Sequence, residues 1–125
     1  MGLISGLMGH ATQVSVDSIK KEFAPILVEG EEIAAAYKLI RDMLVFTNKR
    51  LILVDKQGMT GTKVEYLTIP YSKISCFAKE SAGLLDLDAE LKIWIHGHAT
   101  PIVKEFKKDN SVNEIYQLLS QATLG

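Results

Sequence analysis

The spacing of apolar residues changes twice along this chain, and each change predicts a new kind of element. Residues 18–27 carry apolar side chains every three or four positions, the spacing of a helix with one buried face. Asp17 stands where an N-cap is expected, Pro25 should kink or split the helix because it lacks an amide donor, and Gly30 should close it. The buried stripe of this predicted helix consists of Ile19, Phe23, Ile26 and Leu27.

From residue 31 to residue 107 the apolar period shortens to two, which is typical of strands. Asn48 tolerates the positive φ of a tight hairpin turn. Pro70 has to lie at a strand end or on a sheet edge, because it cannot donate to a ladder. The predicted strands are residues 33–39, 43–47, 51–54, 64–68, 75–79, 91–95 and 102–106, with a turn at 97–100 before the last of them.

The C-terminal residues return to helical spacing. Ser111 and Glu114 have the spacing of a capping box, in which each side chain bonds the other residue's backbone amide. The apolar stripe that follows is Val112, Ile115, Leu119 and Ala122, with Tyr116 at its edge. Several short strands followed by one amphipathic helix predict a small barrel or sandwich with the helix closing an open side.

Composition narrows the possible functions. A chain of 125 residues is expected to fold as one domain with a real core. Its 14 Lys and Arg residues against 15 Asp and Glu give a formal charge of −1, without the basic excess of a nucleic-acid binder. Cys76, the single cysteine, excludes an internal disulfide and is expected to be a buried, inert thiol. A reducing cytoplasm suits this usage.

Residues 1–16 contain no Lys, Arg, Asp or Glu. They lack the basic start of a secretory signal, are too polar and glycine-rich to span a bilayer, and have Gly6 where myristoylation requires Ser or Thr. Two interpretations remain open: a frayed tail, or a short apolar helix that docks on another surface. The residues that would make that contact are Leu3, Ile4, Leu7 and Met8.

Catalytic and metal-binding patterns are weak. His96 and His98 flank a glycine in a predicted turn with no third ligand nearby, whereas zinc needs three or four. Asp86, Asp88 and Glu90 alternate with apolar residues, which indicates a solvated strand face rather than a calcium loop. The chain has no nucleophile elbow and no phosphate-binding glycine loop. We therefore expect no enzyme activity, no metal and no cofactor.

Three cations near the first hairpin are the candidates for binding a phosphorylated head group: Lys38, Arg41 and Arg50. Such a ligand requires several convergent cations and donors. Asp42 directly follows Arg41 and is a ready partner for it, and Arg50 is expected to anchor its own hairpin. A structural role therefore competes with a ligand role for both arginines.

Short motifs along residues 31–119 carry a family resemblance. They are Arg41-Asp42, Phe46-Thr-Asn-Lys-Arg50, Gly58 with Gly61, Ile69-Pro-Tyr71, Glu80-Ser-Ala-Gly83 and Asp86-Leu-Asp-Ala-Glu-Leu91. Together they resemble the bacterial pleckstrin-homology-like family, long described as a domain of unknown function. The resemblance implies an all-β fold with flanking helices: a seven-stranded bent antiparallel barrel or sandwich, capped by a C-terminal helix and preceded by an N-terminal helix. Residues 1–30 would form the helical segment, and residues 31–125 the pleckstrin-homology-like domain.

The same resemblance implies symmetric, ring-shaped homo-oligomers. We therefore expect a non-enzymatic interaction or scaffold module that self-assembles into a homo-oligomer and contacts no nucleic acid, with a further protein as a second kind of partner. The alternative is a peripheral membrane adaptor that binds lipid through the N-terminal apolar segment or through a basic hairpin. Residues 1–16 carry no Lys or Arg to attract anionic lipid, which weighs against that alternative.

Overall fold

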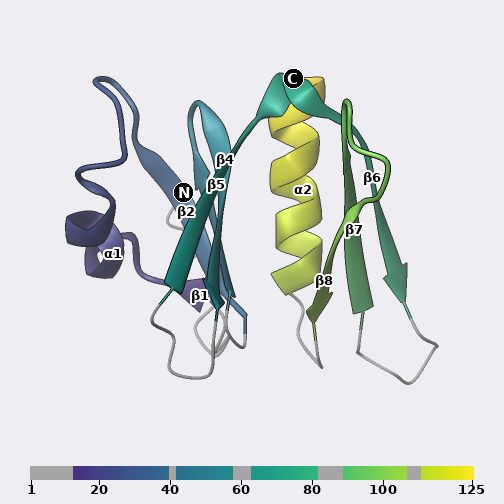
Figure 1. Ribbon diagram of the computed structural model, residues 1–125, viewed down its shortest axis with the longest axis horizontal. Coiled ribbons are helices and arrows are strands. Elements are labelled where there is room, and N and C mark those ends of the chain that lie inside the picture. The colour runs from purple at the N-terminus through teal and green to yellow at the C-terminus, as the bar shows by residue number, and fades with distance from the viewer. Residues whose placement is uncertain (1–12, 40–41, 58–62, 82–88, 107–110) are drawn as a thin grey trace. The chain divides into compact units, whose positions relative to one another are not determined.

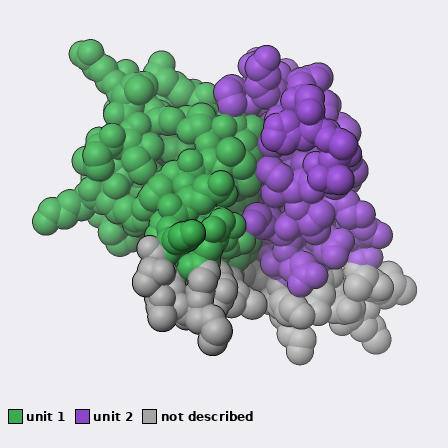
Figure 2. All heavy atoms as spheres, in the orientation of Figure 1, with its two compact units in different colours: residues 1–69 green, residues 70–125 purple. Residues whose placement is uncertain are grey.

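The computed structural model describes residues 13–39, 42–57, 63–81, 89–106 and 111–125. The chain divides into two compact units, Met1–Ile69 and Pro70–Gly125 (Figure 2). The described residues form two β-sheets, one in each unit, with one α-helix near each end of the chain (Figure 1). This confirms the predicted fold class. No helix among the described residues is long and apolar enough to cross a membrane.

The first unit is a sheet whose strands follow chain order. Its elements are β1 (Gln13–Val14), α1 (Val16–Phe23), β2 (Ile33–Lys38), β3 (Asp42–Thr47), β4 (Arg50–Gln57) and β5 (Lys63–Pro70). The sheet order is β1-β2-β3-β4-β5, so β5 is an end strand. Pro70 is the last residue of β5, as predicted. The two-residue strand β1 was not predicted, because it is too short to show a period.

Helix α1 differs from its prediction at both ends. It begins at Val16 and not at Ser18, with Ser15 at the cap position, and Asp17 lies inside the first turn. The Ser18 hydroxyl donates to the Ser15 carbonyl oxygen at 2.7 Å. The helix ends at Phe23 and is not merely kinked: Ala24 still has helical φ and ψ of −52° and −43°, but Pro25 has no amide proton to continue the helical hydrogen bonds.

Gly30 does not end the helix. It lies in the separate turn in which the Glu31 amide donates to the Val28 carbonyl at 3.0 Å. Its φ of 82° explains the glycine there, since other residues rarely adopt that conformation.

The core of the first unit is built from α1 and the sheet. Ile19 and Phe23 on α1 pack with one face of β2, β3 and β4, contributed by Ala36, Met43, Val45, Ile52 and Val54. The side chains that point to the opposite face are also buried: Ala35, Tyr37, Leu44, Phe46, Leu51 and Leu53. Burial on both faces accounts for the nearly continuous apolar runs of β3 and β4.

The second unit is a three-stranded antiparallel sheet with a helix. A single 3₁₀ turn, Tyr71–Lys73, leads into β6 (Ile74–Ser81), β7 (Ala89–Ile95) and β8 (Ile102–Phe106), followed by α2 (Ser111–Leu124). Strands β2–β8 therefore correspond to the predicted strands, and Trp94 lies in β7 as expected. The capping box of α2 stays a prediction: Ser111 is the first helical residue and is buried, and the position before it lies outside the described residues.

Candidate functional site

The polar centre of the first unit is an ion pair between Glu31, just before β2, and Arg50, at the start of β4. The pair is bidentate: the Arg50 Nε–Glu31 Oε2 distance is 2.8 Å, and the Arg50 Nη2–Glu31 Oε1 distance is 2.9 Å. The Glu31 side chain is 0% exposed and that of Arg50 is 18% exposed. The Thr47 hydroxyl and the Val28 amide also donate to this carboxylate, at 2.6 and 3.0 Å.

These contacts keep Glu31 ionised. The hydrogen bond from Arg50 lowers the pKa of Glu31 from its ordinary 4.5 to about 2, against the opposing effect of burial, with further lowering by Thr47 and the Val28 amide. A buried carboxylate with a bidentate arginine and two other donors is fully satisfied. The geometry therefore describes a structural anchor and not a group available to a ligand.

Arg50 also holds other segments of the unit. Its Nη1 donates to the Thr68 hydroxyl of β5 at 2.9 Å, and its Nη2 donates to the Ile26 carbonyl at 2.8 Å. The prediction that Arg50 anchors its hairpin is confirmed, and the anchor reaches further than the hairpin itself. Because this guanidinium binds the chain's own groups, it is a poor candidate for a lipid head group.

Asn48 holds the same hairpin from outside. Its side-chain oxygen accepts from the Glu32 amide at 2.8 Å, and its side-chain nitrogen donates to the Gly30 carbonyl at 3.0 Å. Its backbone amide donates to the Glu32 carbonyl at 3.0 Å. These three hydrogen bonds fix the entry of the chain into β2, a role for Asn48 beyond the tight turn that the sequence predicted.

The other predicted interaction residues are not brought together by the described structure. Lys38 is exposed at the end of β2. Arg41 and the apolar residues Leu3, Ile4, Leu7 and Met8 lie outside the described residues. Of the three candidate cations, the structure describes only Lys38 and Arg50, and Arg50 serves the anchor.

The solvent exposure of individual side chains tests two further predictions. Cys76 is exposed, so its prediction as a buried thiol was wrong. The reason is the register of the sheet: Cys76 pairs with Trp94 on one face of β6, whereas Phe77 lies on the other face and packs against Tyr116 of α2.

His96 and His98 lie in an exposed turn around Gly97, as predicted. Asp86 and Asp88 lie outside the described residues, and no group of three potential metal ligands occurs among the residues that are described.

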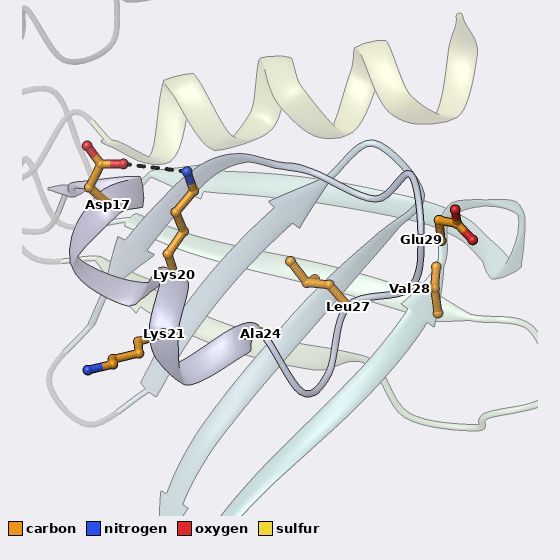
Figure 3. Close-up of a pocket in the computed structure, with 7 residues that line it drawn as sticks. All are labelled: Asp17, Lys20, Lys21, Ala24, Leu27, Val28 and Glu29. Carbon is orange, nitrogen blue, oxygen red and sulfur yellow. Dashed lines mark ion pairs between the residues drawn. The ribbon is translucent and has the colours of Figure 1, made fainter.

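A groove runs beside α1 (Figure 3). It is lined by Asp17, Lys20, Lys21, Ala24, Leu27, Val28 and Glu29. Lys20 lies 3.9 Å from Asp17, and both side chains are largely exposed. Two acidic and two basic residues are therefore mixed along an open depression. That arrangement selects no particular charged ligand, and an exposed pair of this kind contributes little stability.

Strand β5 is the surface feature that sequence reasoning missed. Residues 63–68 are all exposed, including the apolar side chains of Val64, Tyr66 and Leu67, at 40%, 37% and 36%. Tyr66 is held on one side: its ring packs edge-on against Phe23 with centroids 5.8 Å apart, and its hydroxyl donates to Glu22 at 2.6 Å. A whole strand of period-two sequence is expected to bury one face, so its exposure is visible only in the fold.

Comparison with known proteins supports the fold and names the family. Over 121 residues the chain is 55% identical to the uncharacterized protein YjqA of Bacillus subtilis, covering 96% of this chain and 97% of that protein. A crystal structure of a DUF1696 family protein with a pleckstrin-homology domain from Shewanella loihica is 49% identical with a TM-score of 0.81, covering 90% of this chain and 96% of that one. A pleckstrin homology domain from Shewanella amazonensis is 49% identical with a TM-score of 0.83, covering 89% and 100%. The bacterial PH domain model matches residues 2–123, and the chain therefore belongs to the bacterial PH domain family.

Proposed function

We propose that this chain is a cytoplasmic, non-enzymatic interaction module that self-assembles into a homo-oligomer larger than a dimer. The observation that carries the proposal is the exposed end strand β5. Membership of the PH domain family is consistent with a non-catalytic module. The family resemblance of the sequence adds the expectation of a closed, ring-shaped assembly.

The physical argument begins with the edge of the sheet. An end strand presents unpaired amide and carbonyl groups, which are a ready template for another strand. Proteins that avoid such pairing shorten the strand or place lysine, proline or inward-pointing charge along it. β5 has eight residues, with Lys63 at its start and Pro70 at its end, while Val64, Tyr66 and Leu67 lie exposed between them. Glu65 is the one charged residue of β5 after Lys63, so the central part of this edge is only weakly protected.

The side chains add to what the backbone offers. Exposed apolar side chains clustered on one element commonly mark an interaction surface, and aromatic residues are enriched in such contacts. Because Arg50 bonds Thr68 and Glu22 bonds Tyr66, the strand is fixed before any partner arrives. A strand that is already ordered loses less conformational entropy on association.

A contact between β5 and a different surface of the next copy would be heterologous, and such contacts close into a ring when the rotation permits. Residues 1–16, with their apolar side chains, are proposed to contribute to this assembly between neighbouring copies or to recruit a second partner. Lipid binding through the basic hairpin is the weaker alternative, because Arg50 is already bound to Glu31.

Light scattering coupled to gel filtration tests the proposal. The full-length chain should elute at a mass above that of a dimer at micromolar concentrations. The Val64→Lys/Leu67→Lys double variant puts like charges on the edge and should shift the mass towards the monomer. Val28→Lys is the matched control: Val28 is 56% exposed in a turn outside β5, and its substitution should leave the mass unchanged.

A wild-type chain at monomer mass would contradict self-assembly itself. An oligomer that persists in the double variant would remove β5 from the interface. If the oligomer is unchanged after deletion of residues 1–16, only the role given to that segment fails. Sedimentation of the wild-type chain with anionic vesicles at physiological salt, which we do not expect, would favour the membrane alternative.

A further inference from the structure

The sheet of the second unit has two unlike faces. Phe77 packs against Tyr116 of α2 with ring centroids 5.2 Å apart, and the Lys79 ammonium donates to Asn113 of α2 at 2.6 Å. These odd-numbered residues of β6 pair with Ile93 and Leu91, so this face of the sheet meets the helix. The alternate residues of β6, β7 and β8 point to the opposite side, here called the outer face.

One half of the outer face is apolar. On this half, Cys76 of β6 pairs with Trp94 of β7. Lys92 of β7 pairs with Ala78 of β6 on one side and with Val103 of β8 on the other. Cys76 is exposed, Val103 is 44% exposed, and Trp94 is half-buried. The solvent side of an antiparallel sheet is ordinarily polar. Apolar residues including the single tryptophan of the chain are therefore unexpected there.

The other half of the outer face carries a row of carboxylates. Glu80, Glu90 and Glu105 stand directly opposite one another on β6, β7 and β8, and we call them the glutamate row. Like charges in directly opposed positions destabilise a sheet. Lys92 lies 3.0 Å from Glu80, and the hydrogen bond with that carboxylate raises the pKa of Lys92. The charge of Glu90 also raises the pKa of Lys92, so a single cation faces the three carboxylates. Among the described residues no ion pair is made by Glu90 or Glu105.

We propose that the outer face is a docking surface for a protein segment that presents apolar side chains next to Lys or Arg. The apolar half around Trp94 and Val103 would bury the apolar side chains, and an arginine or lysine would lie between Glu90 and Glu105. Two opposed carboxylates suit a guanidinium, which donates to both at once. Buried tryptophans and arginines are also the residues that most often dominate interface energies.

Replacing residues of the glutamate row distinguishes a role in binding a partner from a purely structural role. If the row served stability, replacing Glu90 and Glu105 with glutamine would lower the melting temperature. If the row serves a cationic partner, the same replacement removes repulsion in the free protein while weakening binding. The surface is distinct from β5, so its test does not depend on self-assembly.

A random-peptide display library, panned on the full-length chain and counter-selected on Val103→Lys, tests the proposal. The enriched peptides should carry Lys or Arg beside aliphatic or aromatic residues, and their titration should shift the emission of Trp94 to shorter wavelength. Glu90→Gln/Glu105→Gln should weaken their binding about tenfold or more without lowering the melting temperature. Val28→Lys, the same substitution at another exposed valine, should bind them as the wild type does.

Several results would overturn the proposal. Enriched peptides that are acidic or uncharged would remove the role of the glutamate row. Unchanged affinity in the double glutamine variant, or a Trp94 emission that does not respond, would place the peptides elsewhere. Failure to find any peptide that distinguishes the wild type from Val103→Lys would exclude the outer face as a docking surface.

Discussion

Glu31→Gln is the change whose effect the structure defines most sharply. The substitution keeps the size of the side chain but removes the charge that the Arg50 guanidinium meets at 2.8 and 2.9 Å. A pKa held at about 2, against an ordinary 4.5, corresponds to about 3 kcal/mol of stability at neutral pH. Loss of one partner from a buried ion pair typically costs about 3–5 kcal/mol. Both arguments predict a destabilisation of about 3 kcal/mol.

The stability contributed by Glu31 is also expected to depend on pH. Between pH 4.5 and pH 2 the unfolded chain takes up a proton at Glu31 while the folded chain does not, so the stability contributed by the ionised group is lost as the pH falls through this range. Glu31→Gln lacks this titration. The stability difference between wild type and variant should therefore be full at pH 7 and small near pH 2.

Urea unfolding followed by circular dichroism, repeated between pH 7 and pH 2, measures this difference. Glu32→Gln is the matched control, since Glu32 is the exposed neighbour and binds Asn48 through its backbone. We expect it to change the free energy of unfolding by less than about 0.5 kcal/mol. A loss below about 1 kcal/mol for Glu31→Gln, or a loss that does not vary with pH, would refute the anchor as described.

Two further stability predictions follow from single side chains. Asn48→Ala removes the bonds to Gly30 and Glu32 and should lower the free energy of unfolding by about 1–2 kcal/mol, whereas equal stability in a denaturant titration would show that the hairpin closes without them. Leu119→Ala truncates a fully buried residue of α2 and should cost about 2–5 kcal/mol, and a loss under half a kcal/mol in the same assay would remove Leu119 from the core.

The order and type of the elements were predictable because they depend on local chemistry. A period of two marks a strand with one buried face, and a short, strand-length apolar run marks a buried strand; these two signals located β2–β8 in order. Pro70 ends β5 because it lacks an amide proton, and no distant residue alters that fact. The start of α2 at Ser111 followed from the same kind of local signal. Helix α1 was placed less accurately, because several nearby polar residues competed for its cap.

Partners far apart in sequence were less predictable. That Arg50 anchors its hairpin could be inferred from its position, but its partner Glu31 lies 19 residues away. Neither residue looks unusual by itself, because charged residues preceding or opening a strand are common on protein surfaces. Only the fold brings the two residues together and makes the pair bidentate, and the hydrogen bond from Arg50 then lowers the pKa of Glu31 against the opposing effect of burial.

The sequence by itself determined the elements, their order and the absence of a recognisable catalytic motif. The tertiary structure alone decided which faces are covered. Cys76 was expected to be buried because its neighbours are apolar, yet the register with β7 puts it on the face opposite α2. The glutamate row likewise exists only once three strands are in register. The physical reason is that periodicity states which residues share a face, whereas burial and charge repulsion depend on what is packed against that face.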